Sequence, residues 1–318
     1  MHPFFRVLVA ALAARHALAL SSTGHTPTGT PIFDLPAGTM LQQSGSDMHA
    51  IAANGSIIHG FENAVPTRTS STRSQSPVTR QAGATVAMTS ALATWDSDDG
   101  IEFFNTTIVV PPEPATFDSQ LMLFGAGVVD PDITGAPQGI FSVGLQYGGA
   151  SFMQGLAGYE GGSFWTPLMI LEFVPDPTLV RISLFSSPST TPVVLNSGDI
   201  LSVSFSGSSE AVGNLTYHLY TASVPNRPDL SDATVAWQTP VNAVTMRAVE
   251  YGVVSGSDYP DESLVFGNVT LELDSGFPAL DWSVPDGVDP ATSIEIELQD
   301  ANSDGQKGQV VFVFPDSD

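Results

Sequence analysis

Residues 201–206 read Leu-Ser-Val-Ser-Phe-Ser, and this stretch decides the fold class. Leu201, Val203 and Phe205 alternate with serines, and a period of two places the apolar side chains on one face of a strand and the hydroxyls on the other. Residues 294–299 repeat the pattern, with Ile, Ile and Leu alternating with Glu, Glu and Gln. Half-buried strands of this kind belong to sheets that pack on another layer through one face.

Further strand-like runs follow from Thr85 onward, separated by clusters of Pro, Gly, Asp and Asn. The chain contains 24 Pro and 29 Gly, which favours many short strands joined by turns. The predicted strands are 101–110, 120–124, 139–147, 166–173, 180–185, 200–205, 215–221, 244–253 and 263–273. We therefore predict an all-β protein in which two antiparallel sheets pack face to face as a β-sandwich.

The N-terminus has the pattern of a secretory signal peptide over residues 1–19. Met1–Arg6 is a short basic start, Val7–Ala14 is apolar, and Ala17-Leu-Ala19 is a cleavage site of small residues. A short membrane anchor is the alternative, but this apolar run is too short to span a bilayer. We expect a secreted, extracellular protein that has no membrane association after signal cleavage.

The rest of the chain divides by composition into three parts. Residues 20–84 are predicted to be a pro-region, with a small hairpin around Asn54–Gly55 and a linker over 64–84 that is rich in Ser, Thr, Arg and Gln. Residues 85–274 hold the predicted β-sandwich domain. Residues 275–318 form a C-terminal extension, whose last hairpin either joins the sandwich or forms an appendage.

The charge and the lack of cysteine exclude several classes of function. Nine Lys and Arg stand against 33 Asp and Glu, for a net charge of -24, which would repel nucleic acid. Such a charge repels itself at neutral pH, so it favours an acidic medium. With no cysteine, a disulfide framework, a thiol nucleophile and thiolate metal ligands are all excluded.

Four Asn-x-Ser/Thr triplets are candidate N-glycosylation sites in a secreted eukaryotic chain. They begin at Asn54, Asn105, Asn214 and Asn268.

The sequence predicts neither a metal site nor a cofactor. His218 is the only histidine after residue 60, so a Ser-His-Asp triad and a His-ligated zinc site both lack residues. Asp300–Gly305 opens like a calcium-binding loop, but the twelfth position is Val311 instead of Glu, and strands flank it. We interpret it as a hairpin turn.

Several motifs between residues 85 and 274 resemble, in order and spacing, those of a group of secreted fungal proteins related to the eqolisins, the glutamic peptidases. The motifs are Ala-Thr-Trp at 93–95, the run 104–114, Leu-Phe-Gly at 123–125, the run 140–148, Ser-Phe-Trp at 163–165, the run 197–201, and Ala-Val-Glu-Tyr-Gly-Val at 248–253 with Asp-Tyr-Pro at 258–260.

The resemblance implies a concanavalin-like sandwich with one sheet bent into a cleft, a removable pro-segment, and an acid-active endopeptidase that acts on unfolded protein or peptide through a Gln/Glu dyad. Glu250 matches the glutamate, the general base toward water. Ser142 stands where the family has its glutamine, the oxyanion donor. Gln146 lies on the same strand face about 13 Å further on, and we take it as the other candidate partner. Trp165 and Tyr147 would line the cleft and bind substrate.

Two other functions remain open from the sequence. One is a non-catalytic module that binds extracellular polysaccharide or the cell wall, with aromatic residues such as Trp165 stacking on sugars. The other is a glycoside hydrolase, which needs two carboxylates facing each other across a cleft. Glu160 with Glu172, or Glu250 with Glu272, are pairs that could serve, although 33 acidic residues give many such combinations.

Overall fold

The computed structural model describes residues 20–26, 29–65, 86–95, 99–117, 120–131, 137–148, 162–173, 178–182, 193–284, 294–299 and 307–316. These residues form two large sheets, and the one helical element among them is a short 3-10 turn, Gly256–Asp258. No helix in these ranges is long and apolar enough to cross a membrane. The predicted signal peptide, most of the predicted linker and the Asp300–Gly305 turn lie outside the described residues.

One sheet has nine strands in the order β1-β2-β11-β10-β9-β8-β15-β6-β17. Their bounds are β1 Gly24–His25, β2 Pro31–Leu35, β11 Thr178–Ile182, β10 Trp165–Phe173, β9 Pro137–Gly148, β8 Leu121–Pro131, β15 Ala243–Tyr251, β6 Val86–Thr94 and β17 Asp281–Ser283.

The other sheet has ten strands in the order β18-β19-β16-β7-β12-β13-β14-β3-β4-β5. Their bounds are β18 Glu295–Gln299, β19 Gly308–Val313, β16 Leu264–Leu273, β7 Ile101–Val109, β12 Ile200–Val212, β13 Leu215–Ser223, β14 Ala233–Trp237, β3 Met40–Ser44, β4 Asp47–Ile51 and β5 Ile57–Phe61.

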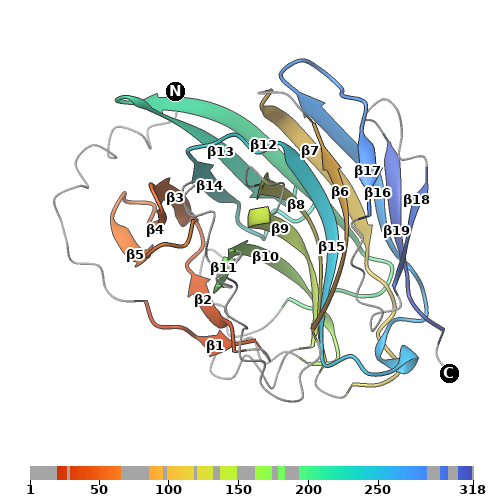
Figure 1. Cartoon of the computed structure of the whole chain (residues 1–318). Coiled ribbons are helices and arrows are strands. Elements are labelled where there is room, and N and C mark those ends of the chain that lie inside the picture. Colours follow the sequence, from red (N-terminus) through yellow and green to blue (C-terminus); the bar gives the residue numbers. More distant parts are fainter. Residues whose placement is uncertain are drawn as a thin grey trace, which may run out of the picture.

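The two sheets pack as a sandwich around one large apolar core. In Figure 1 the ten-stranded sheet runs as an arc from β3, β4 and β5 over β13 and β12 to β16, β19 and β18, and the nine-stranded sheet lies inside this arc. Phe205 on β12 contacts Phe141 on β9, with ring centroids 5.6 Å apart, and so joins the two layers. Apolar residues from both sheets form a single buried cluster, which confirms the predicted all-β sandwich.

The alternating stretch that predicted the fold lies in β12 as expected. Leu201, Val203 and Phe205 are buried in the core between the sheets, while the serines between them are less buried. All of the strands predicted between residues 101 and 273 have observed counterparts. β6 and β14 were not predicted, because their small or short apolar runs gave no clear alternation.

The prediction of purely antiparallel sheets needs a correction. β2 pairs in parallel with β11, and β3 pairs in parallel with β14. Both parallel pairs involve residues 20–65, which also contain the predicted hairpin as the antiparallel pair β4 and β5. This segment therefore adds strands to both sheets.

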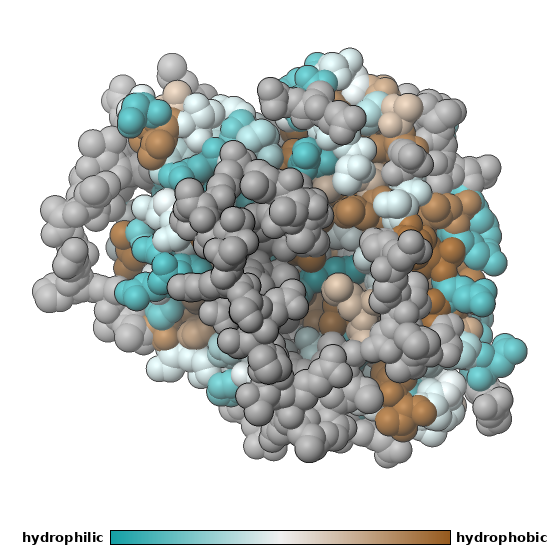
Figure 2. Space-filling model, in the orientation of Figure 1, coloured by the Kyte–Doolittle hydropathy of each residue, from teal (hydrophilic) through white to brown (hydrophobic). Residues whose placement is uncertain are grey.

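The C-terminal hairpin joins the ten-stranded sheet, because β19 pairs with β16 on one side and with β18 on the other. The edge strand β18 exposes Glu295 and Glu297. Figure 2 shows strongly hydrophilic side chains interspersed with apolar ones near this side of the molecule. Charged side chains on an edge strand discourage pairing with other chains.

Candidate functional site

The candidate residues lie on the two faces of the central strands of the nine-stranded sheet. On β15, Val244, Met246 and Ala248 belong to the core between the sheets, whereas Val249 and Tyr251 belong to a separate apolar cluster. We call the core side the inner face, and the side turned away from the ten-stranded sheet the outer face. Because side chains alternate along a strand, even-numbered residues of β15 lie on the inner face.

Glu250 lies on the inner face and is buried. The hydroxyl of Tyr259 donates a hydrogen bond to Glu250 Oε2 at 2.7 Å. The other carboxyl oxygen, Oε1, is buried and has no hydrogen-bond partner among the described residues. Removal from water raises the pKa of Glu250 to about 8, although the hydrogen bond from Tyr259 acts in the opposite direction. Glu250 is therefore a neutral carboxylic acid in acidic and neutral solution.

Gln146 and Ser142 lie on the outer face of β9. Their odd-numbered neighbours, including Tyr147, belong to the core, so the even-numbered positions point the other way. Gln146 is buried and its Nε2 donates a hydrogen bond to the Gly148 carbonyl oxygen at 3.0 Å. Its amide is thus held by its own strand.

The strand register separates Gln146 from Glu250. Glu250 is paired with Met122 on β8, which is paired with Tyr147 on β9. Gln146 instead pairs with Leu123 on β8, and Leu123 pairs with Val249, one position before Glu250 on β15. A one-residue difference in register places a side chain on the opposite face of a sheet. Glu250 therefore points into the core while Gln146 and Ser142 point outward, and the structure does not bring the expected dyad together.

A different polar cluster occupies the outer face. Arg247 on β15 forms an ion pair with Glu172 on β10, with Nη1 and Oε2 2.5 Å apart, and its Nη2 lies 3.4 Å from Ser142 Oγ. Two strands separate β15 from β10, so their backbones are about 14 Å apart in a flat sheet. The contact across this span indicates that the sheet is bent toward its outer face. Arg247 and Ser142 are buried there.

Glycines on β8 and β9 make room for this cluster. A Cβ atom on Gly144 would overlap the Phe124 carbonyl oxygen, and one on Gly127 would overlap Phe141. Beside Ser142 and Arg247, Gly125 and Gly144 line a cavity of about 10 Å³, roughly the space of one water molecule. The cluster is a closely packed charge pair, and sequence reasoning missed it. The only sequence signal was Arg247, the one basic residue of β15.

Trp165 and Tyr147, predicted to bind substrate, are core residues. Both are fully buried on the inner face, and their ring centroids are 5.0 Å apart. Trp165 Nε1 donates a hydrogen bond to the Pro112 carbonyl oxygen at 3.3 Å. The prediction that these two rings line a cleft therefore does not agree with the structure, because the alternation that buries Tyr147 places it on the core side.

The other candidate groups lie apart from this sheet. His218 Nδ1 is 3.1 Å from Ser209 Oγ on the exposed β12–β13 hairpin, and no described carboxylate bonds to the other ring nitrogen. Partial burial lowers the pKa of His218, and nothing there orients it as a catalytic base. Glu272 lies on β16 between the core residues Leu271 and Leu273, so it points away from the core and does not face Glu250. Glu160 lies outside the described residues. No group of three or more possible metal ligands occurs in the described ranges.

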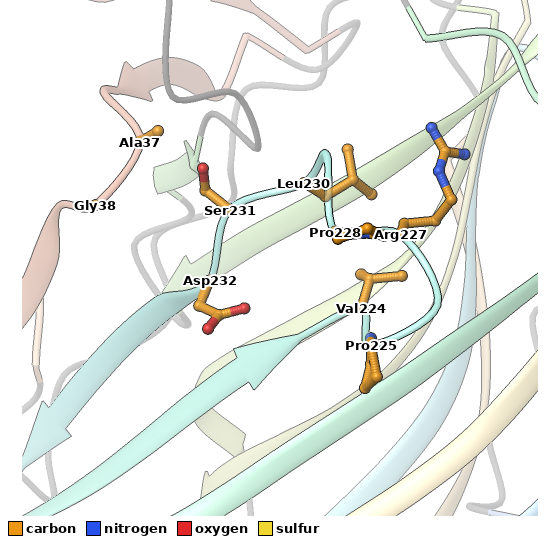
Figure 3. Close-up of a pocket in the computed structure, with 9 residues that line it drawn as sticks. All are labelled: Ala37, Gly38, Val224, Pro225, Arg227, Pro228, Leu230, Ser231 and Asp232. Atoms are coloured by element: carbon orange, nitrogen blue, oxygen red, sulfur yellow. The ribbon is translucent and has the colours of Figure 1, made fainter.

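An open surface pocket lies between the β2–β3 turn and the β13–β14 loop (Figure 3), with a cavity volume of about 540 Å³. In Figure 3, the side chains of Arg227 and Asp232 lie apart on the loop and do not point toward each other. Arg227 is instead paired with Asp229, with Nη2 and Oδ2 2.6 Å apart. The pocket is lined by Ala37, Gly38, Val224, Pro225, Arg227, Pro228, Leu230, Ser231 and Asp232.

The four predicted glycosylation sites differ in exposure. Asn54 lies in the β4–β5 turn, Asn214 in the β12–β13 turn, and Asn268 at an irregularity of β16; all three are exposed. Asn105 lies in the middle of β7, and its Oδ1 atom is buried.

Among proteins of known structure, the chain is similar in fold to two crystal structures of one peptidase. No family model and no curated protein matches the chain. The fold is similar to a crystal structure of scytalido-glutamic peptidase with a peptide-based transition-state analogue, at 12% identity over 73% of this chain and 100% of that chain, with a TM-score of 0.40. It is also similar to scytalido-glutamic peptidase with a transition-state analogue inhibitor, at 12% identity over the same shares, with a TM-score of 0.42. Neither likeness is close enough to assign a role to a residue of this chain.

Proposed function

We propose that this protein is a secreted β-sandwich that binds polypeptide and does not act as a glutamic peptidase. One observation supports this most directly: Glu250 and Gln146 lie on opposite faces of the same sheet. A base and an oxyanion donor must converge on one reacting carbonyl and one water. The sheet separates the side chain of Glu250 from that of Gln146, so the two cannot converge on one carbonyl. The same holds for Ser142, because it lies on the same face as Gln146.

The protonation of Glu250 argues in the same direction. A general base must be ionised, and its ideal pKa lies near the working pH. Burial raises the pKa of Glu250 to about 8, so this carboxyl is protonated throughout the acidic range in which the resemblance implies activity. It also accepts a hydrogen bond from Tyr259 in the core, far from any substrate that approaches the outer face.

The ligand class follows from which side chains are accessible. Sugar binding through stacking needs exposed aromatic rings, but Trp165 and Tyr147 are fully buried. A glycosidase needs two facing carboxylates, and Glu172, the carboxylate we find on the outer face of β10, is already paired with Arg247. The predicted aromatic and carboxylate sites therefore do not favour a sugar ligand, and polypeptide is the ligand class that we propose.

The first half of β6, at the half-exposed Met88, offers a place where an extended polypeptide could add as a strand. β17 pairs with only three residues of β6, at Leu92, Ala93 and Thr94. The preceding residues, Val86–Ala91, pair with β15 and lie before the three positions that β17 pairs with. Met88 in this stretch is 50% exposed, and it could supply an apolar contact.

The first test is cleavage of a fluorescent, unfolded casein by the full mature protein from pH 2 to 7, next to the Glu250→Gln variant. We expect no cleavage above the rate of a buffer control at any pH. Acid-dependent cleavage that is lost in Glu250→Gln would contradict the proposal and establish a glutamic peptidase.

Binding is measured with the same casein by fluorescence anisotropy. Met88→Lys should weaken binding about tenfold or more, because a charge on a strand edge opposes strand addition. Val254→Lys is the matched control, since Val254 is 79% exposed on a different loop and the charge change is the same. No binding by the unmodified protein, or equal loss in both variants, would refute a polypeptide site at β6.

A further inference from the structure

Residues 20–65 contribute strands to both layers of the sandwich. In the nine-stranded sheet β2 pairs with β11 over four positions, from Ile32 with Leu179 to Leu35 with Ile182. In the ten-stranded sheet β3 pairs with β14 over three positions, from Met40 with Thr234 onward. The segment thus forms the end of each sheet, as seen at the left of Figure 1.

The side chains of this segment are part of the shared core. Phe61 on β5 contacts Phe173 on β10 of the opposite sheet, with ring centroids 6.4 Å apart. The segment's members of the main core cluster are Leu35, Leu41, Met48, Ala50, Phe61 and Val65. Burial of this many apolar side chains is the main source of stability in a sandwich.

A specific polar contact supports the same arrangement. Gln43 on β3 is buried, and its Oε1 accepts a hydrogen bond from the backbone N–H of Gln238 at 2.8 Å, directly after β14. Gln238 is partly buried, so this hydrogen bond adds a polar contact between the segment and the body of the protein.

Loss of the segment would uncover two strand edges at once. β11 would keep only β10 as a neighbour, and β14 would keep only β13. Uncovered edges of this kind pair with other chains and cause aggregation. A pro-segment that is built to leave would not be expected to complete both sheets.

We infer that residues 20–65 are a permanent structural part of the protein, and that they stay bound by sheet pairing and core packing when the chain is cut between residues 65 and 86. The two strand edges, on β11 and β14, are the binding surface, and the chain's own N-terminal segment is the partner. Maturation by cleavage would then yield two polypeptides in one particle. This inference does not depend on the proposed function.

The test uses the full chain with a recognition sequence for a specific protease in place of residues 70–76. After complete cutting, verified on a denaturing gel, native size-exclusion chromatography separates bound from released segment. We expect both fragments to elute together in a 1:1 ratio at the position of the uncut protein. Elution of the C-terminal fragment alone, as a soluble monomer with the melting temperature of the uncut protein, would overturn the inference.

A second measurement needs no cutting. Leu41→Ala in the intact chain deletes a fully buried side chain of the segment, and Leu215→Ala deletes the same atoms at a site that is 43% exposed. We expect Leu41→Ala to lower the melting temperature of the whole protein by about 5–10 °C in one transition, and Leu215→Ala to change it by less than about 2 °C. Failure of Leu41→Ala alone to fold would agree with this. An unchanged main transition in Leu41→Ala would contradict it.

Discussion

Replacing Glu250 by Gln should stabilise the protein at neutral pH and leave its stability in acid unchanged. The pKa of Glu250 is raised from its ordinary value of 4.5 to about 8 in the folded state, because the carboxyl is removed from water. Glutamine keeps the shape and stays neutral, so it removes the cost of ionising this side chain. Tyr259, which donates to Oε2, can donate to the amide oxygen in the same way.

The sign and size follow from proton linkage. Below about pH 4.5 the carboxyl is protonated in both the folded and the unfolded state, so it does not affect the free energy of unfolding. Between about 4.5 and 8 the unfolded chain binds fewer protons than the folded protein, so stability falls by up to about 1.4 kcal/mol per pH unit. Above about pH 8 the loss is complete. At pH 7 the loss is about 3 kcal/mol.

The assay is the unfolding free energy of both proteins in guanidinium chloride from pH 4 to 8. The difference between the variant and the parent isolates Glu250, because the remaining charges are the same in both. We expect Glu250→Gln to equal the parent at pH 4 and to exceed it increasingly up to pH 8. If the variant is less stable than the parent at pH 7, or if the difference does not change with pH, the burial of a neutral Glu250 is refuted.

Three further predictions concern the outer face and the surface. Gly144→Ala should lower the melting temperature by more than about 5 °C or prevent folding, since its Cβ would overlap the backbone of the next strand; circular dichroism on heating measures this. Glu172→Gln should destabilise by roughly 3 kcal/mol at pH 7, because Arg247 would stay buried without its ion-pair partner, and an effect below about 0.5 kcal/mol in denaturant unfolding would contradict it. In protein secreted from a eukaryotic host, Asn214→Gln should remove one glycan by intact mass, whereas Asn105→Gln should leave the mass of attached glycan unchanged, because Asn105 lies partly buried in a central strand.

The strands that alternate or carry β-branched runs could be predicted from the sequence, and their limits agree within a few residues at most strand ends. β7, for example, was expected over 101–110 and is observed at Ile101–Val109. In the N-terminal segment only the hairpin of β4 and β5 was predicted, from its Asn54–Gly55 turn, and the other strands could not be predicted. β3, with the sequence Met-Leu-Gln-Gln-Ser, is short and polar, and its parallel partner lies almost 200 residues away. Such long-range pairing leaves no local pattern.

The candidate site shows a sharper limit of sequence reasoning. The period of two correctly placed Ser142 and Gln146 on one face of β9. However, the face of Glu250 relative to theirs depends on the register between three strands, and that register is set by the whole sheet. In the observed register, Val249 pairs with Leu123, which pairs with Gln146. A shift of β15 by one residue would have turned Val249 into the core and placed Glu250 beside the side-chain amide of Gln146.

Two independent features make the folded state more stable as the pH falls. The net charge of -24 repels itself most strongly when all carboxylates are ionised, and protonation relieves this repulsion. Glu250 also makes the folded state more stable as the pH falls. Its pKa is raised in the folded protein, so it destabilises folding only at pH values where the carboxyl of the unfolded chain is ionised. The stability of the parent protein should therefore rise as the pH falls from 8 toward 5.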